Sequence, residues 1–461
     1  MSSALDELQA TVSSAAHAGR WSNGLDTLAN FVRLINSDPA SAGKIYESRP
    51  LDGLCLEIAR GMARDENWDQ RPRSEADRET QVYVATELYE SGGHTRVLED
   101  FIAAQPGRRH LILLTKLHGR TTRAKIEARF AAPNVVVECA PAHDAAETVR
   151  WLAGRLQALA EARIFLFTHH EDAVAVTACA SITLARLYFY HHADHHLALG
   201  LHLPGAVHLD LTPFSFFHCR DAARLSRVTY LPLTTPEVAA RPPAEFCLSP
   251  TEAGLVTCSC GSEGKFTAPY DFNYFDLMAQ ALAQTRGSHV HIGPLSGDMV
   301  TRFHERLASW GVAAERVRLV TQVPSLAAAL SEFNVSLYLG SWPLGGARAI
   351  IEALGTGTPV LVHQNYTHEY LGGQTLLPPR GLIWRTPNEL FDILQNVTRA
   401  ELQDQSRHSR EHWEIYHRGQ HLSRWLAPEE VKTGLIPSAL PIYEPDRLRT
   451  WLGTRGKGID F

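Results

Sequence analysis

The chain has 461 residues, of which 44% are hydrophobic and 20% are charged, and its formal net charge is -6. Since one hydrophobic core rarely serves more than roughly 250–300 residues, we expect two or more domains. The acidic balance argues against a nucleic-acid partner, and no run of about 18 apolar residues predicts a membrane span. The first residues lack the basic and apolar regions of a secretory signal. This predicts a cytoplasmic protein, with peripheral contact to a membrane left open.

Cysteine usage predicts reduced, buried thiols. The seven cysteines are odd in number and lie mostly in apolar runs, which argues against a disulfide framework. Cys258 and Cys260 stand one residue apart without a second pair, so that spacing does not predict a zinc site.

The periodicity of apolar residues changes along the chain. Residues 1–78 contain segments with helical spacing, such as GLDTLANFVRLI, which predict a separate helical region. From Gln81, short apolar strands such as RIFLF alternate with helices, and after the Pro-rich segment 231–246 the same alternation restarts. We therefore predict an α/β protein with two doubly wound, Rossmann-like domains facing each other across a cleft. The expected divisions are a helical region (1–78), an amino-terminal domain (79–235), a carboxyl-terminal domain (236–420) and a helical tail (421–461).

The most informative segment is residues 337–362, LYLGSWPLGGARAIIEALGTGTPVLV. It predicts a strand, a turn at Gly345 and Gly346, a helix from about Ala347 to Leu354, and a second strand. The glycines leave backbone N–H groups accessible to a ligand, and the helix N-terminus favours a phosphate at the same point. Glu352 lies six residues beyond Gly346, about 9 Å along the helix, where its carboxylate could accept from ribose hydroxyls. An ordinary strand-turn-helix unit is the alternative.

Histidines follow two predicted strands of the amino-terminal domain. The run YHHADHH contains His191, His192, Asp194, His195 and His196 at the end of one strand. In a helix, His191 and His195 would share one face, but the spacing offers no third metal ligand. The run therefore predicts either contact with an acceptor or sugar, through His191, His192 and His195, or a structural turn capped by Asp194. A second pair, His169 and His170, is expected at the rim of the site.

Four segments together resemble the GT-B glycosyltransferases, in particular the bacterial glycogen-synthase-like and O-GlcNAc-transferase-like groups. They are SGGHTRVLEDFI (91–102), YHHADHHLALG (190–200), GSEGKF (261–266) and GGARAIIEALGTGTPV (345–360). The resemblance implies that a nucleotide-sugar, with UDP as the expected nucleotide, binds mainly to the carboxyl-terminal domain. It also implies that the acceptor binds to the amino-terminal domain and that no metal is needed.

The resemblance assigns roles to particular residues. Lys265 would meet the donor phosphates, although a solvated loop lysine is the alternative. The turn at Val323 would hold the base through backbone groups. The full set of expected donor-binding residues is Gly93, Gly261, Ser262, Lys265, Val323, Gly345, Gly346, Ala347 and Glu352.

For catalysis, the resemblance points to His94 as the base that removes the acceptor proton, because an imidazole takes up a proton near cellular pH. Asp194 is the second candidate base, and Thr95 beside His94 is expected to contact the acceptor. Alternatively, His94 packs the start of a helix. Retaining members of the glycogen-synthase-like family carry a carboxylate eight positions before Glu352, where this chain has Leu344, and this difference favours inversion.

Together these observations predict a glycosyltransferase that moves a sugar from a nucleoside diphosphate to a protein, glycan or lipid acceptor. Two alternatives stay open: an epimerase of the same architecture acting on UDP-sugars, and a non-catalytic scaffold. Residues 1–78 are interpreted as an acceptor-docking or dimerising module, so the partners also include a second copy of the chain.

Overall fold

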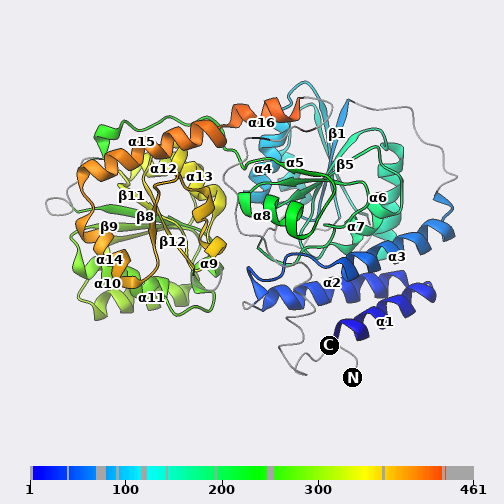
Figure 1. Cartoon of the computed structure of the whole chain (residues 1–461), viewed down its shortest axis with the longest axis horizontal. Coiled ribbons are helices and arrows are strands. Elements are labelled where there is room, and N and C mark those ends of the chain that lie inside the picture. The colour runs from blue at the N-terminus through cyan, green and yellow to red at the C-terminus, as the bar shows by residue number, and fades with distance from the viewer. Residues whose placement is uncertain are drawn as a thin grey trace. The chain divides into compact units, whose positions relative to one another are not determined.

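The structure is a computed structural model that describes most of the chain. The described residues are 4–38, 41–68, 79–89, 93–115, 122–141, 144–192, 195–246, 254–365 and 369–427, with Val431 and Gly434. The chain divides into two compact units, and each contains one parallel sheet with helices around it (Figure 1). Unit 1 comprises Met1–Leu231 and Trp425–Phe461, and unit 2 comprises Pro232–Arg424.

Unit 1 is built on a seven-stranded parallel sheet with the strand order β3-β2-β1-β4-β5-β6-β7. The central strands are apolar runs buried on both faces, as expected for a parallel sheet covered by helices. The strands are β1 (Thr80–Ala85), β2 (Arg109–Leu114), β3 (Val135–Cys139), β4 (Arg163–Phe167), β5 (Arg186–His191), β6 (Val207–Asp210) and β7 (Val228–Tyr230).

The two faces of this sheet differ in composition, because alternate residues of a strand point to opposite faces. One face carries aliphatic residues such as Val82 and Ile164, which belong to one core with α6 (Ala145–Ala158) and α7 (Ala173–Ala180). The other face is aromatic: Phe101 of α4 (Gly93–Ala103) packs edge-on against Phe167 at 5.1 Å and against Tyr190 at 5.5 Å. Between β2 and β7, the sheet is also accompanied by the helices α5 (Arg123–Arg129) and α8 (Pro213–Phe217) and by a π-helix, His218–Ala222.

Three amino-terminal helices belong to unit 1: α1 (Ala4–His17), α2 (Trp21–Ser37) and α3 (Arg49–Asp65). Their apolar residues, among them Leu28 and Ile58, share the aliphatic core with Val149 of α6 and Val176 of α7 (Figure 1). The predicted helical region therefore forms an outer layer of unit 1 and has no core of its own. Removing it would expose apolar surface of α6 and α7.

Unit 2 contains a six-stranded parallel sheet with the order β10-β9-β8-β11-β12-β13. Its strands are β8 (Val256–Cys260), β9 (Ser288–Ile292), β10 (Val317–Val320), β11 (Leu337–Leu339), β12 (Val360–His363) and β13 (Leu382–Trp384). Its helices are α9 (Gly264–Thr267), α10 (Tyr274–Gln284), α11 (Gly297–Ser309), α12 (Leu326–Glu332), α13 (Ala347–Gly355), α14 (Pro387–Asn396) and α15 (Arg399–Tyr416). The last helix, α16 (Gly419–Leu426), crosses the division between the units.

The α/β architecture with two parallel sheets is confirmed, and the predicted helix after Gly346 spans Ala347–Gly355. The sequence patterns missed β6, because it has only four residues and includes the polar His208 and Asp210. The cysteines within the described ranges are free thiols; four of them are buried, as predicted, whereas Cys139 and Cys260 are half-buried. No helix in those ranges is long and apolar enough to cross a membrane.

Candidate functional site

The strand order of unit 2 brings two predicted motifs together. β8 pairs with β9 on one side and with β11 on the other, so the connections after β8 and β11 leave the sheet in opposite directions. Open α/β sheets bind ligands at such a switch point, beyond the carboxyl ends of the strands. Gly261 and Lys265 follow β8, and Gly345 and Gly346 follow β11. Two segments about 80 residues apart thus form one site.

Lys265 links the two segments directly. Its ammonium Nζ donates to the carbonyl of Gly345 at 3.2 Å, and the Leu344 N–H donates to the Lys265 carbonyl at 3.3 Å. Burial lowers the pKa of this ammonium, and the nearby Cys260 thiol counteracts the shift. Lys265 is also the single lysine in the sequence of residues 232–424. The side chain therefore places one cation beside the glycine turn.

The two glycines of this turn are required for different reasons. A Cβ atom on Gly345 would lie 2.7 Å from the Leu371 carbonyl oxygen, and the Gly345 N–H donates to that same oxygen. A Cβ atom on Gly346 would lie 3.2 Å from Lys265 Nζ. Gly345 therefore allows close backbone packing, whereas Gly346 leaves space in front of the ammonium. We expected both N–H groups to face a ligand, but that of Gly345 is already bonded within the unit.

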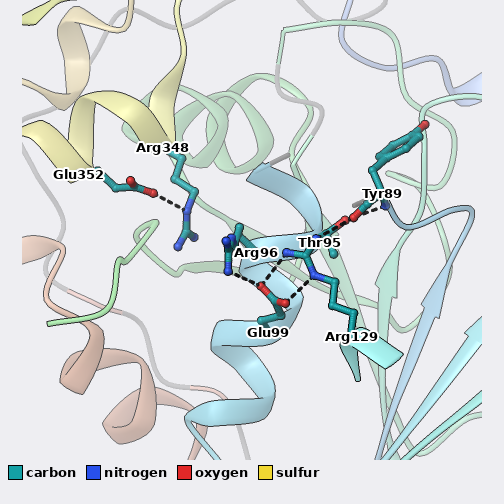
Figure 2. A network of polar contacts seen from close by, with 7 residues as sticks. All are labelled: Tyr89, Thr95, Arg96, Glu99, Arg129, Arg348 and Glu352. Atoms are coloured by element: carbon teal, nitrogen blue, oxygen red, sulfur yellow. Dashed lines mark hydrogen bonds and ion pairs between the residues drawn. The ribbon is translucent and has the colours of Figure 1, made fainter. Parts of the chain in front are cut away.

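Helix α13 begins at this turn, with Gly346 as its N-cap. Gly346 has no side chain to cap the helix, and the first N–H groups of any α-helix lack partners inside the helix, so this helix start suits an anion. One turn further on, Glu352 Oε1 accepts from Arg348 Nε at 3.1 Å (Figure 2). The Arg348 and Glu352 side chains are 12% and 20% exposed, so the pair is ordered but reachable.

Arg348 was not predicted as a site residue. Its spacing of four residues from Glu352 is the signal that could have identified it, because such residues share a helix face. The arginine holds one carboxylate oxygen of Glu352, Oε1. The negative charge of Glu352 also acts on Cys260: burial raises the pKa of that thiol to about 11, and Glu352 adds to the shift.

A buried polar network packs against α9. The Tyr274 hydroxyl hydrogen-bonds His289 Nε2 at 2.7 Å and His291 Nδ1 at 3.0 Å, and the Phe266 ring packs against Tyr274 at 4.4 Å. Burial lowers the pKa of His289 to about 3 and that of His291 to about 4, so both rings are neutral at pH 7. The network fixes the position of the helix that carries Lys265.

The other predicted donor residues have different surroundings. Ser262 is exposed at the start of the connection after β8. Gly261 packs closely, since a Cβ atom there would lie 3.1 Å from the Lys265 side chain. Val323 is half-buried between β10 and α12. Strand β9 separates β10 from β8, so the structure places Val323 at the same edge of the sheet but does not bring it to the glycine turn.

Unit 1 has its own switch point between β1 and β4, where the predicted histidines gather. Gly93 is the first residue of α4, and His94 and Thr95 follow it. Thr95 is fully buried, and its hydroxyl accepts from the Tyr89 N–H at 2.9 Å. This buried contact fixes Tyr89, which follows β1, to the first turn of α4.

Arg129 holds the connection between β1 and α4 from the neighbouring helix. Its guanidinium donates twice to the Glu99 carboxylate, at 2.6 and 3.0 Å, and once to the Tyr89 carbonyl at 3.0 Å (Figure 2). Arg96 donates to the same carboxylate at 3.2 Å. Two-point pairs of this kind are strong and directional. The sequence contained no local signal for this network, because Arg129 lies 30 residues after Glu99.

The imidazole rings of unit 1 form one cluster. The His94 and His192 rings stack with centroids 4.2 Å apart, and His169 lies 5.7 Å from His94. His170 and His196 lie 5.4 Å apart, and His195 and His196 lie 4.6 Å apart. His169 and His170, which we expected at the rim, are thus part of the cluster itself.

Two of these rings, those of His94 and His192, have lowered pKa values. Burial, with a contribution from His169, lowers the pKa of His94 to about 3. Burial also lowers the pKa of His192 well below its usual value, and His94 adds to that shift. Neither His94 nitrogen makes a hydrogen bond of ordinary geometry within the described ranges. The His94 ring is therefore unprotonated and able to accept a proton, although so low a pKa makes it a weak base.

The rest of the histidine run differs from the helical arrangement that we considered. His191 is the last residue of β5, and the described residues after it form a turn, so His191 and His195 do not share a helix face. His191 is buried, and its Nδ1 atom hydrogen-bonds Asp210 Oδ1 at 2.8 Å. Asp194, the second predicted base, lies outside the described residues.

Comparison with known proteins gives the fold. No family model matches the sequence, and no curated protein is significantly similar to it. Among solved structures, Anabaena HepE in complex with UDP and glucose superposes with a TM-score of 0.55 at 14% identity, over 75% of this chain and 98% of HepE. The lipopolysaccharide outer core galactosyltransferase WaaB gives 0.55 at 12% identity, over 74% and 97% of the two chains. A glycosyltransferase from Rickettsia africae gives 0.51 at 11%, over 75% and 96%.

The chain has the GT-B fold. Each of its two sheets carries the predicted motifs at its own switch point: Lys265, Gly346 and Glu352 in unit 2, and the histidine cluster in unit 1. In unit 2, the ammonium of Lys265 on α9 and the N-terminus of α13 are groups that attract an anion, and Glu352 follows on α13.

Proposed function

We propose that this protein is a glycosyltransferase that transfers a sugar from a nucleoside-diphosphate sugar, with UDP as the expected nucleotide. One observation supports this most directly: the Lys265 ammonium, Gly346 and the N-terminus of α13 converge at the switch point of the unit 2 sheet. Glu352 stands one to two turns along the same helix. HepE, which shares the fold, is described in complex with UDP and glucose, which supports the choice of nucleotide.

The chemistry of transfer explains why these groups are needed. When the bond between the sugar and the diphosphate breaks, the leaving group gains negative charge and the sugar becomes oxocarbenium-like. Lys265 and the N–H groups at the start of α13 would stabilise that charge without a metal at the donor site. Glu352, held by Arg348 through one oxygen, would accept from the ribose hydroxyls through the other.

On the acceptor side, we propose His94 as the base. Its ring is neutral at pH 7 because burial lowers its pKa to about 3, and it stacks on the His192 ring, whose pKa burial also lowers. It would take the proton of an acceptor hydroxyl or amide as the acceptor attacks the sugar carbon. The low pKa makes His94 a weak base in the absence of substrate, so polar contacts from the acceptor would have to raise it. Leu344, where retaining relatives place a carboxylate, favours inversion.

Ligand binding tests the donor assignment first. A panel of UDP, UDP-glucose, UDP-GlcNAc, GDP-mannose and ADP-glucose is compared by thermal shift. A true ligand at 100 times its Kd adds about 2.7 kcal/mol of stability, which corresponds to roughly 5–10 °C for a domain of this size. If no nucleotide in the panel raises Tm, the donor-site proposal fails.

Product analysis then separates the candidate activities. A transferase releases UDP, by slow hydrolysis without an acceptor and faster with one, whereas an epimerase yields a new UDP-sugar from the donor alone. A scaffold binds without turnover. The anomeric configuration of the first product, read by NMR, decides between inversion and retention.

A further inference from the structure

A second polar cluster lies inside unit 1, separate from the imidazole stack. His191 ends β5, Asp210 ends the neighbouring strand β6, and Cys219 lies in the π-helix that follows α8. The Cys219 Sγ atom is 3.5 Å from His191 Nδ1 and 3.4 Å from Asp210 Oδ1, and these two atoms are 2.8 Å apart. Among the described residues, these three form the group whose potential metal-ligand atoms all lie within 4.8 Å of one another.

The hydrogen bonds inside this cluster leave two buried polar atoms unsatisfied. Asp210 is 0% exposed and His191 is 1% exposed. Within the described ranges, Asp210 Oδ2 and His191 Nε2 make no hydrogen bond. A carboxylate oxygen buried without a partner is costly, and such an atom in a native site calls for a water or an ion. The cluster therefore contains polar atoms that its own hydrogen bonds do not satisfy.

The three donors match one class of ion. A thiolate sulfur, an imidazole nitrogen and a carboxylate oxygen are the ligands of zinc, and a tetrahedral zinc site places its ligand atoms roughly 3.3–3.6 Å apart. Both distances from Cys219 Sγ fit this spacing. The pair His191–Asp210 is closer because it shares a proton, and the metal would replace that proton. One thiolate and one carboxylate also balance a divalent charge.

We propose that His191, Asp210 and Cys219 bind a structural zinc ion, with Asp210 Oδ2 or a water as the fourth ligand. On binding, the Cys219 thiol releases one proton, and His191 coordinates through Nδ1 as a neutral imidazole with its ring proton on Nε2. The ion clamps the π-helix to the ends of β5 and β6. Because the ligands are buried, its role is to stabilise this edge of the sheet, and it takes no part in the proposed transfer.

The experiment uses the full chain, purified with a reductant and without an affinity tag. Metal analysis should find about one zinc per chain. After chelation, titration with cobalt(II) should give a thiolate-to-cobalt charge-transfer band. Cys219→Ser should reduce bound zinc to below about 0.2 per chain and abolish the band, since it removes the only sulfur ligand. The matched control is Cys179→Ser, which alters a buried thiol of α7 in the same unit.

The outcomes decide the proposal even if Cys219→Ser does not fold. In that case the test uses the wild-type chain. Chelation should lower its Tm, and added zinc should restore the Tm, whereas added magnesium should not restore it. The proposal is overturned if the folded wild-type chain carries no zinc and gives no cobalt band, because the cluster is then a purely hydrogen-bonded one. It is equally overturned if the band persists in folded Cys219→Ser or disappears in Cys179→Ser.

Discussion

Replacing Lys265 with methionine removes the cation of the proposed donor site and keeps most of the apolar stem. In the structure the ammonium donates to the Gly345 carbonyl at 3.2 Å, and this carbonyl can bond water in the variant. The Lys265 side chain is only half-buried, and the network beneath it, through Phe266 and Tyr274, does not involve the ammonium. We therefore expect the variant to fold with nearly unchanged Tm.

The effect on binding follows from the charge. A hydrogen bond to a charged group contributes about 1.5–3 kcal/mol, and each 1.4 kcal/mol is a factor of ten, so UDP binding should weaken by about 10–150-fold. The loss in kcat/KM should be larger, roughly 100–1,000-fold, because the leaving diphosphate gains charge in the transition state. Lys265→Arg keeps the charge with a different shape and should recover part of the binding.

Isothermal titration calorimetry with UDP measures the affinity, and UDP release from the donor measures turnover. Lys125→Met is the matched control, since Lys125 lies on α5 of unit 1, away from the donor motif in the sequence and in a different sheet unit. The reasoning is refuted if folded Lys265→Met binds UDP within about twofold of the wild type, or if Lys125→Met loses as much affinity.

Three further predictions concern the glycine turn, the carboxylate and pH. Gly345→Ala should cost about 1–3 kcal/mol of stability, because it forces a Cβ atom against backbone atoms. Gly346→Ala should keep Tm and weaken UDP binding. Equal losses of Tm in the two variants would contradict this. Arg348→Gln should release Glu352 and reduce the preference for UDP over 2′-deoxy-UDP severalfold, measured by competition; an unchanged ratio would count against a ribose contact. Burial lowers the pKa of His289 to about 3, whereas a histidine in the unfolded chain titrates near 6.5. As pH falls below about 6.5, the unfolded chain takes up this proton first, so the folded state loses stability. Urea unfolding at pH 5 should therefore show about 2 kcal/mol less stability for each such histidine, and a flat profile between pH 7.5 and 5 would contradict the shift.

Features that depend on neighbouring residues could be predicted from the sequence. Buried strands, glycine turns and amphipathic helices are encoded within 10–25 residues, so the two α/β halves and the helix after Gly346 could be predicted. The placing of Gly346 and Glu352 on one helix followed from helical spacing alone. That Lys265 and Gly345 belong to one site was expected only through the family resemblance, because 80 residues separate them, and their direct contact was not predicted.

The sharing of a site by distant residues follows from the tertiary fold and could not be predicted from local patterns. His191 was predicted to meet a sugar, but its partners Asp210 and Cys219 lie 19 and 28 residues away, on a strand and a π-helix that no local pattern indicated. The need for Gly345 arises from the chain at residues 371–372. Helices α1, α2 and α3 belong to unit 1 because their apolar residues share one core with α6 and α7. Burial and long-range pairing depend on how strands are ordered in a sheet, and that order is set by the packing of the whole domain rather than by any short segment.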